Sequence, residues 1–326
     1  MRISRRLIGW ILSLTLLIVA AGVASAQRLS YSSGQSVSPG YEGWEEAEDG
    51  QRYFLFGYMN RNWDEEPDIP VGADNRIEPN GPDHGQPTHF LPRRNRFVFR
   101  VPVPDDFDEE DELVWTLSVN GVTEHAYATL RPDYFVDDII KASEHGAIGA
   151  GTTDPVIRAN VAPTLTVDGA TSRTVRVGEA LRLMVSASDD GVPEPRRRRA
   201  QERSRARDAN DQRRTGGEQR RFGDRRWLPH SRVTVSSETG LRVSWFVYRG
   251  VGNKVTFDPP QTKVWEDTRT GANSPWAPAW ITPLLPEDGR WVTEVTFDEP
   301  GEYRLRCLAS DGALGDEGDI TVMVTS

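Results

Sequence analysis

The feature that most constrains the fold is a pair of alternating segments joined by Asn120-Gly121. The segment before this dipeptide, residues 112–119, is apolar at every second position. Those positions are Leu113, Trp115, Leu117 and Val119. A two-residue period is typical of a β-strand that buries one face, because successive side chains point to opposite faces of a sheet. Asn-Gly readily adopts the positive φ angles of a two-residue hairpin turn, so residues 122–130 are predicted to return as an antiparallel partner.

Two more segments of the N-terminal half have strand character. Residues 51–60 are rich in aromatic residues and follow the turn signal Glu48-Asp49-Gly50, so residues 41–46 are predicted to pair with them as a hairpin. Residues 95–103 alternate as well. Their predicted inward side chains are Phe97, Phe99, Val101 and Val103. Helical periodicity is almost absent from this half, and residues 27–131 are therefore predicted to form an antiparallel β-sandwich domain.

Residues 1–26 have the composition of a secretory signal peptide. Three arginines precede an uncharged apolar stretch at 7–23, and small residues stand before the cleavage position expected at Gln27. The apolar stretch has 17 residues, close to the shortest length that crosses a bilayer, so an uncleaved anchor is the alternative. The paired arginines also fit export by the twin-arginine route. The sequence predicts a periplasmic or extracellular protein without a transmembrane segment after cleavage, and its single cysteine, Cys307, is predicted to be buried.

Charge is distributed unevenly along the chain, which has a formal net charge of −10. Residues 27–160 hold 25 acidic and 11 basic residues, and this acidity argues against a nucleic-acid-binding protein. Residues 194–232 are the exception, with 14 arginines against 6 acidic residues. They have too few apolar side chains to offset the entropy cost of ordering, so the insertion 193–232 is predicted to be disordered. It is either a tolerated surface insertion or an arm that contacts phosphate groups.

A long polar loop, residues 61–94, separates two predicted strands of the first domain. Loops of this length are usually functional or mobile. Asp83, His84 and His89 within it are candidate metal ligands or, alternatively, turn-capping residues. A small basic cluster follows the loop and is predicted to pair with carboxylates such as those of residues 105–112, with an anionic ligand as the alternative. The cluster consists of Arg93, Arg94 and Arg96.

Residues 132–162 are predicted to connect two domains. A short helix is expected within residues 134–144, and residues 146–153 have the Gly- and Thr-rich composition of a linker. Strand-like segments return from residue 163 onward at short intervals. They lie at residues 164–167, 174–177, 180–188, 241–248, 292–297, 304–309 and 319–324.

The C-terminal half carries an ordered series of motifs. Val-Gly-Glu at residues 177–179 precedes a strand that ends on Ala-Ser-Asp-Asp-Gly, a later strand contains Trp245, and Pro-Gly-x-Tyr at residues 300–303 opens a strand that ends on Ala-x-Asp-Gly. This order resembles a PKD-type or related immunoglobulin-like domain of bacterial exported proteins, over residues 163–326. The run at residues 245–250 departs from the Trp-x-Phe-Gly-Asp-Gly typical of PKD domains.

The resemblance implies roles for two aromatic residues. Trp245 would be the core tryptophan of a sandwich, and the Tyr303 hydroxyl would tie down a corner at the start of a strand. The resemblance also implies an adhesion, spacer or recognition module, although a fold alone does not determine a function.

Two groups of side chains are candidate binding residues. Four carboxylates would converge if two strand ends meet at one pole of the second sandwich, and they would then suit Ca²⁺, with ordinary turn chemistry as the alternative. These are Asp189, Asp190, Asp311 and Asp316. Four tryptophans cluster in a Pro-rich stretch, where they would either stack on sugar rings or a partner's side chains, or fold inward as a small core. These are Trp265, Trp276, Trp280 and Trp291.

The sequence contains no Gly-x-Ser-x-Gly nucleophile motif, no Cys-His pair with supporting context, no phosphate-binding Gly loop and no His-Glu-x-x-His zinc-enzyme motif. It predicts an all-β protein of two antiparallel β-sandwich domains, the second immunoglobulin-like (PKD-type) and interrupted by the Arg-rich insertion. The predicted function is a non-catalytic binding or structural module of the bacterial envelope or periplasm. Its expected partner is an envelope protein or a polysaccharide, and no cofactor is expected apart from Ca²⁺. The alternative is a carbohydrate-active enzyme or its accessory carbohydrate-binding protein, which would use the loop at 83–89 or the tryptophans.

Overall fold

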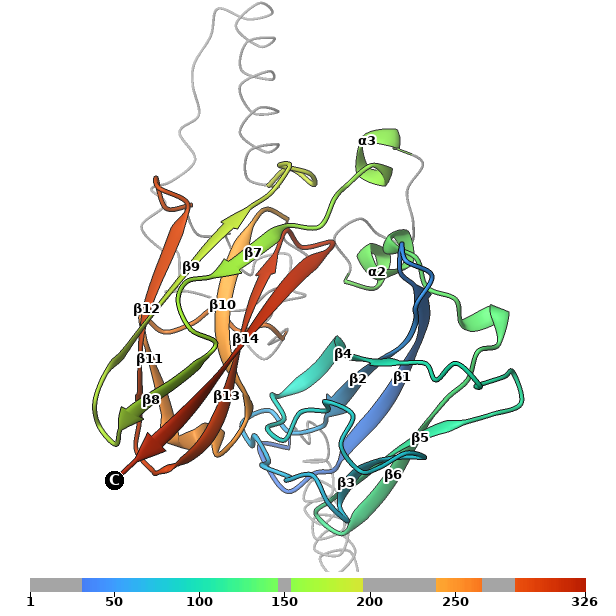
Figure 1. Ribbon diagram of the computed structural model, residues 1–326, viewed down its shortest axis with the longest axis horizontal. Coiled ribbons are helices and arrows are strands. Elements are labelled where there is room, and N and C mark those ends of the chain that lie inside the picture. Colours follow the sequence, from blue (N-terminus) through green and yellow to red (C-terminus); the bar gives the residue numbers. More distant parts are fainter. Residues whose placement is uncertain (1–30, 146–153, 196–238, 266–284) are drawn as a thin grey trace, which may run out of the picture.

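The computed structural model describes residues 31–145, 154–195, 239–265 and 285–326. Nearly all of their regular structure is strand, and the strands form two β-sandwiches that lie side by side (Figure 1). The predicted signal peptide, the Gly- and Thr-rich linker and most of the Arg-rich insertion lie outside the described residues. The prediction of an all-β protein with two sandwich domains is confirmed.

The first domain has two three-stranded antiparallel sheets, with the strand orders β1-β2-β4 and β3-β5-β6. Their bounds are β1 Val37–Glu46, β2 Arg52–Asn60, β3 Asn75–Glu78, β4 Arg93–Pro102, β5 Leu113–Val119 and β6 Val122–Ala128. Both predicted hairpins are present, since β1 pairs with β2 and β5 pairs with β6. Asn120 and Gly121 in the second hairpin turn have φ angles of 52° and 77°. All four alternating apolar residues of β5 are buried, as the two-residue period predicts.

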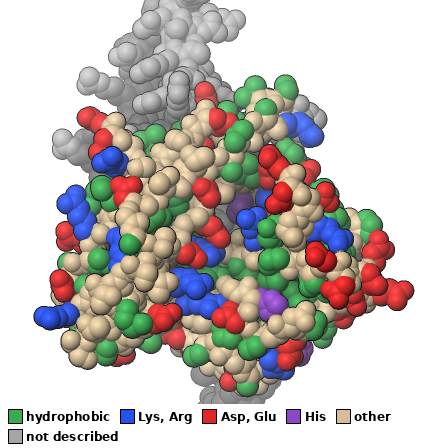
Figure 2. All heavy atoms as spheres, in the orientation of Figure 1, with side chains coloured by type: hydrophobic (Ala, Val, Ile, Leu, Met, Phe, Trp, Pro, Cys, Tyr) green, Lys and Arg blue, Asp and Glu red, His purple; other side chains and the backbone are tan. Residues whose placement is uncertain are grey.

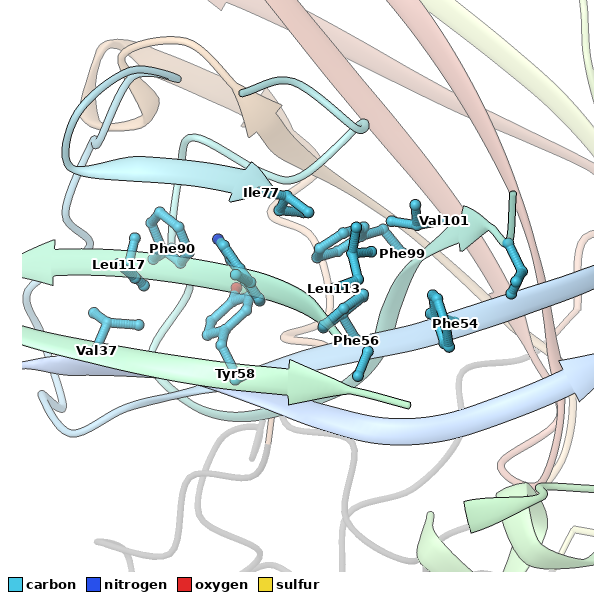
Figure 3. Close-up of a cluster of buried hydrophobic side chains, with 14 of the residues drawn as sticks. Val37, Phe54, Phe56, Tyr58, Ile77, Phe90, Phe99, Val101, Leu113 and Leu117 are labelled. Carbon is cyan, nitrogen blue, oxygen red and sulfur yellow. The ribbon is translucent and has the colours of Figure 1, made fainter. Parts of the chain in front are cut away.

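Trp115 occupies the core of the first domain and is fully buried. Its ring meets Phe56 and Phe99 edge to face, with centroid distances of 5.9 and 5.1 Å. In Figure 3 these two phenylalanines gather with Leu113 in the buried cluster. The indole N–H donates to Asn75 Oδ1 at 3.0 Å, so the one polar atom of the side chain has a partner.

One predicted inward residue, Phe97, leaves the alternation of its strand. β4 is paired with β2 at Phe99 and again at Asn95, but the three residues between them face only Gly57. Phe97 has a φ angle of 49°, and its side chain is half-buried. Extra residues on one strand form a bulge, which breaks the regular alternation of faces. Phe99 and Val101 keep the predicted inward orientation, whereas the prediction for Phe97 is wrong.

The second domain has two four-stranded sheets, with the strand orders β7-β9-β12-β11 and β10-β13-β14-β8. Their bounds are β7 Thr164–Val167, β8 Ser172–Arg176, β9 Leu181–Ser188, β10 Arg242–Arg249, β11 Val255–Asp258, β12 Arg290–Phe297, β13 Gly301–Ser310 and β14 Gly315–Thr325. The first sheet and the β10-β13-β14 part of the second have the strand order of a constant-type immunoglobulin domain. β8 joins the second sheet as a parallel partner of β14, and the other pairings between the described strands are antiparallel. The expected immunoglobulin-like sandwich is confirmed.

Two aromatic residues of the second domain pack as the resemblance implies. Trp245 on β10 is 2% exposed and lies in the core. Tyr303 is buried near the start of β13, and its hydroxyl donates to Glu299 O at 3.0 Å, which is a corner contact. Leu305 stands two residues later, where antibody domains have a cysteine. Cys307 on the same strand is buried, as predicted, and burial raises the pKa of its thiol.

The segment between the domains contains short helices. They are η1 Pro132–Tyr134, α2 Asp138–Glu144 and α3 Pro155–Arg158, and a further turn, η3 Gly252–Lys254, precedes β11. Asp137 caps α2 by accepting a hydrogen bond from the Ile140 N–H. Within the described residues no helix is long and apolar enough to cross a membrane.

Candidate functional site

The two domains meet where the end of β10 reaches residues 61–92, between β2 and β4. The sequence predicted one long loop here, but the segment contains the short strand β3, and residues 93 and 94 already belong to β4. Figure 1 shows the lower ends of β10 and β13 beside the first domain. Tyr248 belongs to β10, but its side chain is 1% exposed and lies in the hydrophobic core of the first domain. Its hydroxyl donates to Gly85 O at 2.6 Å, and its carbonyl accepts the N–H groups of Thr88 and His89 at 3.1 and 3.3 Å. One residue of the second domain therefore completes the core of the first.

Arg249, the next residue, binds the same loop through an ion pair. Its Nη1 and Nη2 donate to the two carboxylate oxygens of Asp83 at 3.0 and 2.7 Å, and its Nε donates to Gln86 O at 2.8 Å. A bidentate pair of this kind fixes orientation as well as contributing energy. The hydrogen bonds from Arg249 lower the pKa of Asp83 to about 2.

His89 is a buried cation between two carboxylates. It is 3% exposed, its Nδ1 lies 2.8 Å from Asp68 Oδ1, and its Nε2 lies 3.0 Å from Glu66 Oε2. Burial alone lowers the pKa of His89, but the hydrogen bonds to these carboxylates outweigh burial and raise the pKa to about 9. Gly252 of the second domain packs against the ring, where a Cβ would collide with the imidazole, and its N–H donates to Asp68 Oδ1 at 3.2 Å.

A second buried cation, Arg306 of β13, also joins the domains. Its guanidinium pairs in a bidentate manner with Asp319, at 2.7 and 2.9 Å, and with Glu317 at 2.8 Å. Its Nη1 donates to Val98 O of the first domain at 2.5 Å, and its guanidinium carbon lies 3.8 Å from the centre of the Tyr248 ring. Figure 2 shows basic and acidic side chains next to each other along the seam between the domains. The domain interface therefore combines a buried aromatic side chain with paired charges.

This interface accounts for the candidate metal ligands of the loop. Asp83 and His89 are engaged in the domain contact, and His84 Nε2 lies 3.2 Å from Pro79 O. Across the described ranges, no group of three or more His, Cys, Asp and Glu side chains is placed to hold a metal ion. Asp83 and His89, on which an enzyme or a metal site in this loop would depend, instead take part in the contact between the domains.

The arginines after the loop have partners that differ from the prediction. Arg94 and Arg96 both reach Glu42 of β1, and Arg96 also pairs with a glutamate of α2. Gly57 leaves room for the contact across the sheet, because a Cβ there would meet the Glu42 carboxylate. The prediction that Arg94 and Arg96 pair with carboxylates is therefore confirmed, but these carboxylates lie on β1 and α2 and not at residues 105–112.

Asp311, one of the four candidate calcium ligands, is fully buried. Its Oδ1 accepts the N–H groups of Ala313 and Leu314 at 2.5 and 2.7 Å, and its Oδ2 accepts from Asn160 Nδ2 at 2.9 Å. Burial raises the pKa of this carboxyl group. Asp311 therefore ties the segment between the domains to the turn before β14.

The other three aspartates also accept hydrogen bonds from the backbone. Asp190 and Asp316 each accept an N–H from the chain at β7 or just before it, at 3.2 and 2.8 Å. Asp189 accepts the N–H two residues later at 2.9 Å, while burial and the nearby charges of Asp311 and Asp190 raise its pKa to about 6. The expected convergence of all four into one ligand group is not found. A calcium site at these residues stays a prediction.

Two of the four tryptophans proposed to bind a ligand are described. Trp265 is 8% exposed, and the Lys263 ammonium lies 5.3 Å from the centre of its ring. Trp291 is half-buried and packs on the core of the second domain. Both rings are therefore packed inward, as the alternative reading predicts, whereas Trp276 and Trp280 lie outside the described residues.

The structure also shows a pocket that the sequence did not predict. It lies on the first domain, has a volume of about 670 Å³, and is lined by residues of β1, β2, the loop after β4 and the segment between the domains. Its lining includes Trp44, Phe107, Leu130 and Phe135 as well as Arg52 and Glu109. No local sequence pattern brings these residues together, because they come from four separate segments.

No protein-family model and no curated protein matches the sequence. Solved structures overlap with it weakly. A chimeric titin Z1Z2 matches 51% of this chain and 97% of its own at 13% identity, with a TM-score of 0.22. The D00-D0 domain of intimin matches 88% of this chain and 100% of its own at 9% identity, with a TM-score of 0.22. Domains 4 and 5 of the S-layer protein SbsC match 66% of this chain and 66% of their own at 10% identity, with a TM-score of 0.23. Identities and TM-scores this low carry no argument about function. The immunoglobulin-like β-sandwich in the second half of the chain is identified by its strand order.

Proposed function

We propose that the chain is an exported, non-catalytic binding or structural module of the bacterial envelope or periplasm, in which the two sandwiches act as one rigid unit. The domain interface is the observation that carries this proposal. Tyr248 lies in the core of the other domain, and Arg249 and Arg306 bond across the boundary. Domains that share buried residues keep a fixed relative orientation, whereas a small polar contact would leave them free to move. A fixed orientation suits a spacer or a presenting module.

The same interface supports a non-catalytic role. An enzyme built on the long loop would need Asp83 and His89 to face a cleft, with a pKa suited to proton transfer. Asp83 is instead paired with Arg249, and His89 is enclosed between two carboxylates of its own loop. The sequence left a carbohydrate-active enzyme or its accessory carbohydrate-binding protein as the alternative function. Of these two, the accessory binding protein fits the structure better.

Export and a PKD-type subfamily are also part of the proposal. The signal-like N-terminus supports export, and the buried thiol of Cys307 suits an oxidising compartment because it is shielded from oxidation and mispairing. The motif order from Val177 to Gly312 supports a PKD-type or related domain.

The test is to express the full chain with its own N-terminal segment in a Gram-negative host. The exported protein is then incubated with isolated envelope material and sedimented, and the soluble fraction is analysed for released fragments. We expect a mature N-terminus at Gln27, retention on the envelope and no released fragments; heat-denatured protein is the control. Released fragments would assign an enzyme, and retention in the cytoplasm or failure to sediment would contradict the proposal.

A further inference from the structure

The pocket on the first domain has an aromatic wall that is already fixed. Trp44 and Phe135 lie edge to face with ring centres 5.0 Å apart, and the Trp44 indole N–H donates to Arg131 O at 3.0 Å. The backbone also holds the pair, because the Val136 N–H donates to Trp44 O at 2.8 Å. Phe107 lines the same pocket and is buried, whereas Phe135 is 44% exposed. The pocket therefore offers solvent an aromatic surface whose geometry does not need to be ordered on binding.

Charged side chains line the same pocket without being paired to each other. Within the described residues, neither the Arg52 guanidinium nor the Glu109 carboxylate makes a hydrogen bond or an ion pair. Asp108 is different, because its Oδ1 accepts the N–H groups of Glu110 and Asp111 at 2.8 and 3.2 Å. A guanidinium offers only donors and a carboxylate only acceptors. The pocket thus presents hydrogen-bonding groups of both kinds beside an apolar surface.

We propose that this pocket binds a saccharide unit of a polysaccharide. The C–H face of a sugar ring would pack on Trp44 and Phe135, while its hydroxyl groups, which both donate and accept, would bond to Arg52 and Glu109. The volume of about 670 Å³ falls within the range of roughly 300–1,000 Å³ that is usual for small-molecule sites. The inference rests on the proposed function, because it names the ligand class of a binding module.

Other ligand classes suit this lining less well. An apolar ligand would remove water from charged side chains without replacing its hydrogen bonds, which is unfavourable. Nucleic acids and free phosphate are opposed by the carboxylates of the pocket and by the 25 acidic against 11 basic residues of residues 27–160. The same carboxylates would attract a cationic peptide whereas Arg52 would repel it, so tetra-arginine is included as a competing probe in the test below. A neutral, hydroxyl-rich ring replaces the lost hydrogen bonds of water and meets no charge repulsion.

Titration of the full chain with oligosaccharides tests this inference. The probes are chitotetraose, cellotetraose, xylotetraose, maltotetraose and a peptidoglycan glycan strand, and binding is followed by tryptophan fluorescence and calorimetry. We expect at least one probe to bind at one site per chain, and Phe135→Ala and Arg52→Gln each to weaken its affinity about tenfold. Tyr127→Ala is the matched control, because Tyr127 on β6 is 51% exposed and does not line the pocket.

Three results would overturn the inference. They are failure of every probe to bind, equal weakening by Tyr127→Ala and the pocket variants, and tighter binding of tetra-arginine than of every saccharide. Circular dichroism of Phe135→Ala separates lost binding from lost folding, and Arg52→Gln provides a second variant that changes no aromatic packing.

If the probes fail while the chain still sediments with envelope material, the ligand class is wrong and the proposed function stands. If a probe binds but the chain fails to sediment, the reverse holds.

Discussion

The charged groups at the domain interface and those at one end of the second domain differ in how they are stabilised. At the interface, His89 and Arg306 are cations, and each lies between two carboxylates. At the end of the second domain, Asp189 and Asp311 are neighbouring carboxylates whose hydrogen bonds come from backbone N–H groups and an asparagine amide. Pairing lets a charge remain inside the protein, whereas like charges that are buried together oppose ionisation. The two regions should therefore lose stability over different pH intervals, and substitution should destabilise the first and stabilise the second.

The largest expected effect comes from breaking the interface at its apolar centre. Tyr248→Ala removes a fully buried ring from the core of the first domain, and such truncations cost about 4 kcal/mol of unfolding free energy. We expect hydrogen exchange of the β5 amides to accelerate, although the substituted residue lies on β10. Urea unfolding with residue-level exchange measures both quantities. Tyr127→Ala is the exposed control, and faster exchange confined to the second domain would show that Tyr248 does not support the first.

The next effect is a pH dependence that belongs to His89. Its pKa is about 9 in the folded protein and about 6.5 when unfolded, so folding favours the protonated ring. The stabilisation is complete below pH 6.5 and is lost as pH rises through 9, by an amount on the order of 3 kcal/mol. Urea unfolding from pH 6 to pH 10 measures this slope, and His89→Gln should flatten it. A wild-type stability that stays constant or rises over this interval would contradict the assignment of a buried imidazolium.

Arg306→Met should have a smaller effect. It removes the hydrogen bonds to Asp319, Glu317 and Val98 O, but both carboxylates keep part of their surface in water and can be rehydrated. We expect a loss of about 2 kcal/mol in the free energy of unfolding. Arg100→Met is the matched control, since Arg100 is 57% exposed, pairs with Glu45 at 3.5 Å, and should contribute less than about 1 kcal/mol. Equal losses in the two variants would mean that the Arg306 pairs act as surface pairs do.

The sequence predicted most of the fold because its strands bury one face. The period of two in β5, the Asn-Gly turn after it and the motif order around Trp245 and Tyr303 are local signals, and each matches the structure. The sequence did not predict the strands β3 and β11. Each has four residues, too few to establish a two-residue period. Phe97 was misplaced because a β-bulge depends on the partner strand, where Gly57 faces three residues.

The candidate sites were harder to predict because their partners are distant in the sequence. The sequence suggested that Asp83 is a metal ligand, but in the structure it pairs with Arg249, which lies 166 residues later in the chain. A cluster of aspartates has the right chemistry for calcium, but the sequence cannot show that backbone N–H groups already use the lone pairs of Asp311. The pocket around Trp44 and Phe135 escaped prediction for the same reason, since its walls come from segments that only the folded chain brings together.

The smallest expected effect comes from Asp189, where substitution should stabilise the protein and not destabilise it. Its folded pKa of about 6 lies above its ordinary value of 3.8, so its contribution to stability is present at low pH and is lost as pH rises through 6. At pH 7 the charged carboxylate is destabilising, and Asp189→Asn, which keeps an oxygen for the N–H of Gly191, should stabilise the domain by about 1 kcal/mol after allowance for solvent screening. Urea unfolding at pH 7 and pH 4 measures the gain, which should vanish at the lower pH. The control is Asp288→Asn, because Asp288 is exposed and accepts the N–H two residues later at 3.1 Å, as Asp189 does. A loss of stability in Asp189→Asn, together with a rise in wild-type melting temperature on adding Ca²⁺ that the variant lacks, would instead make these carboxylates a cation site.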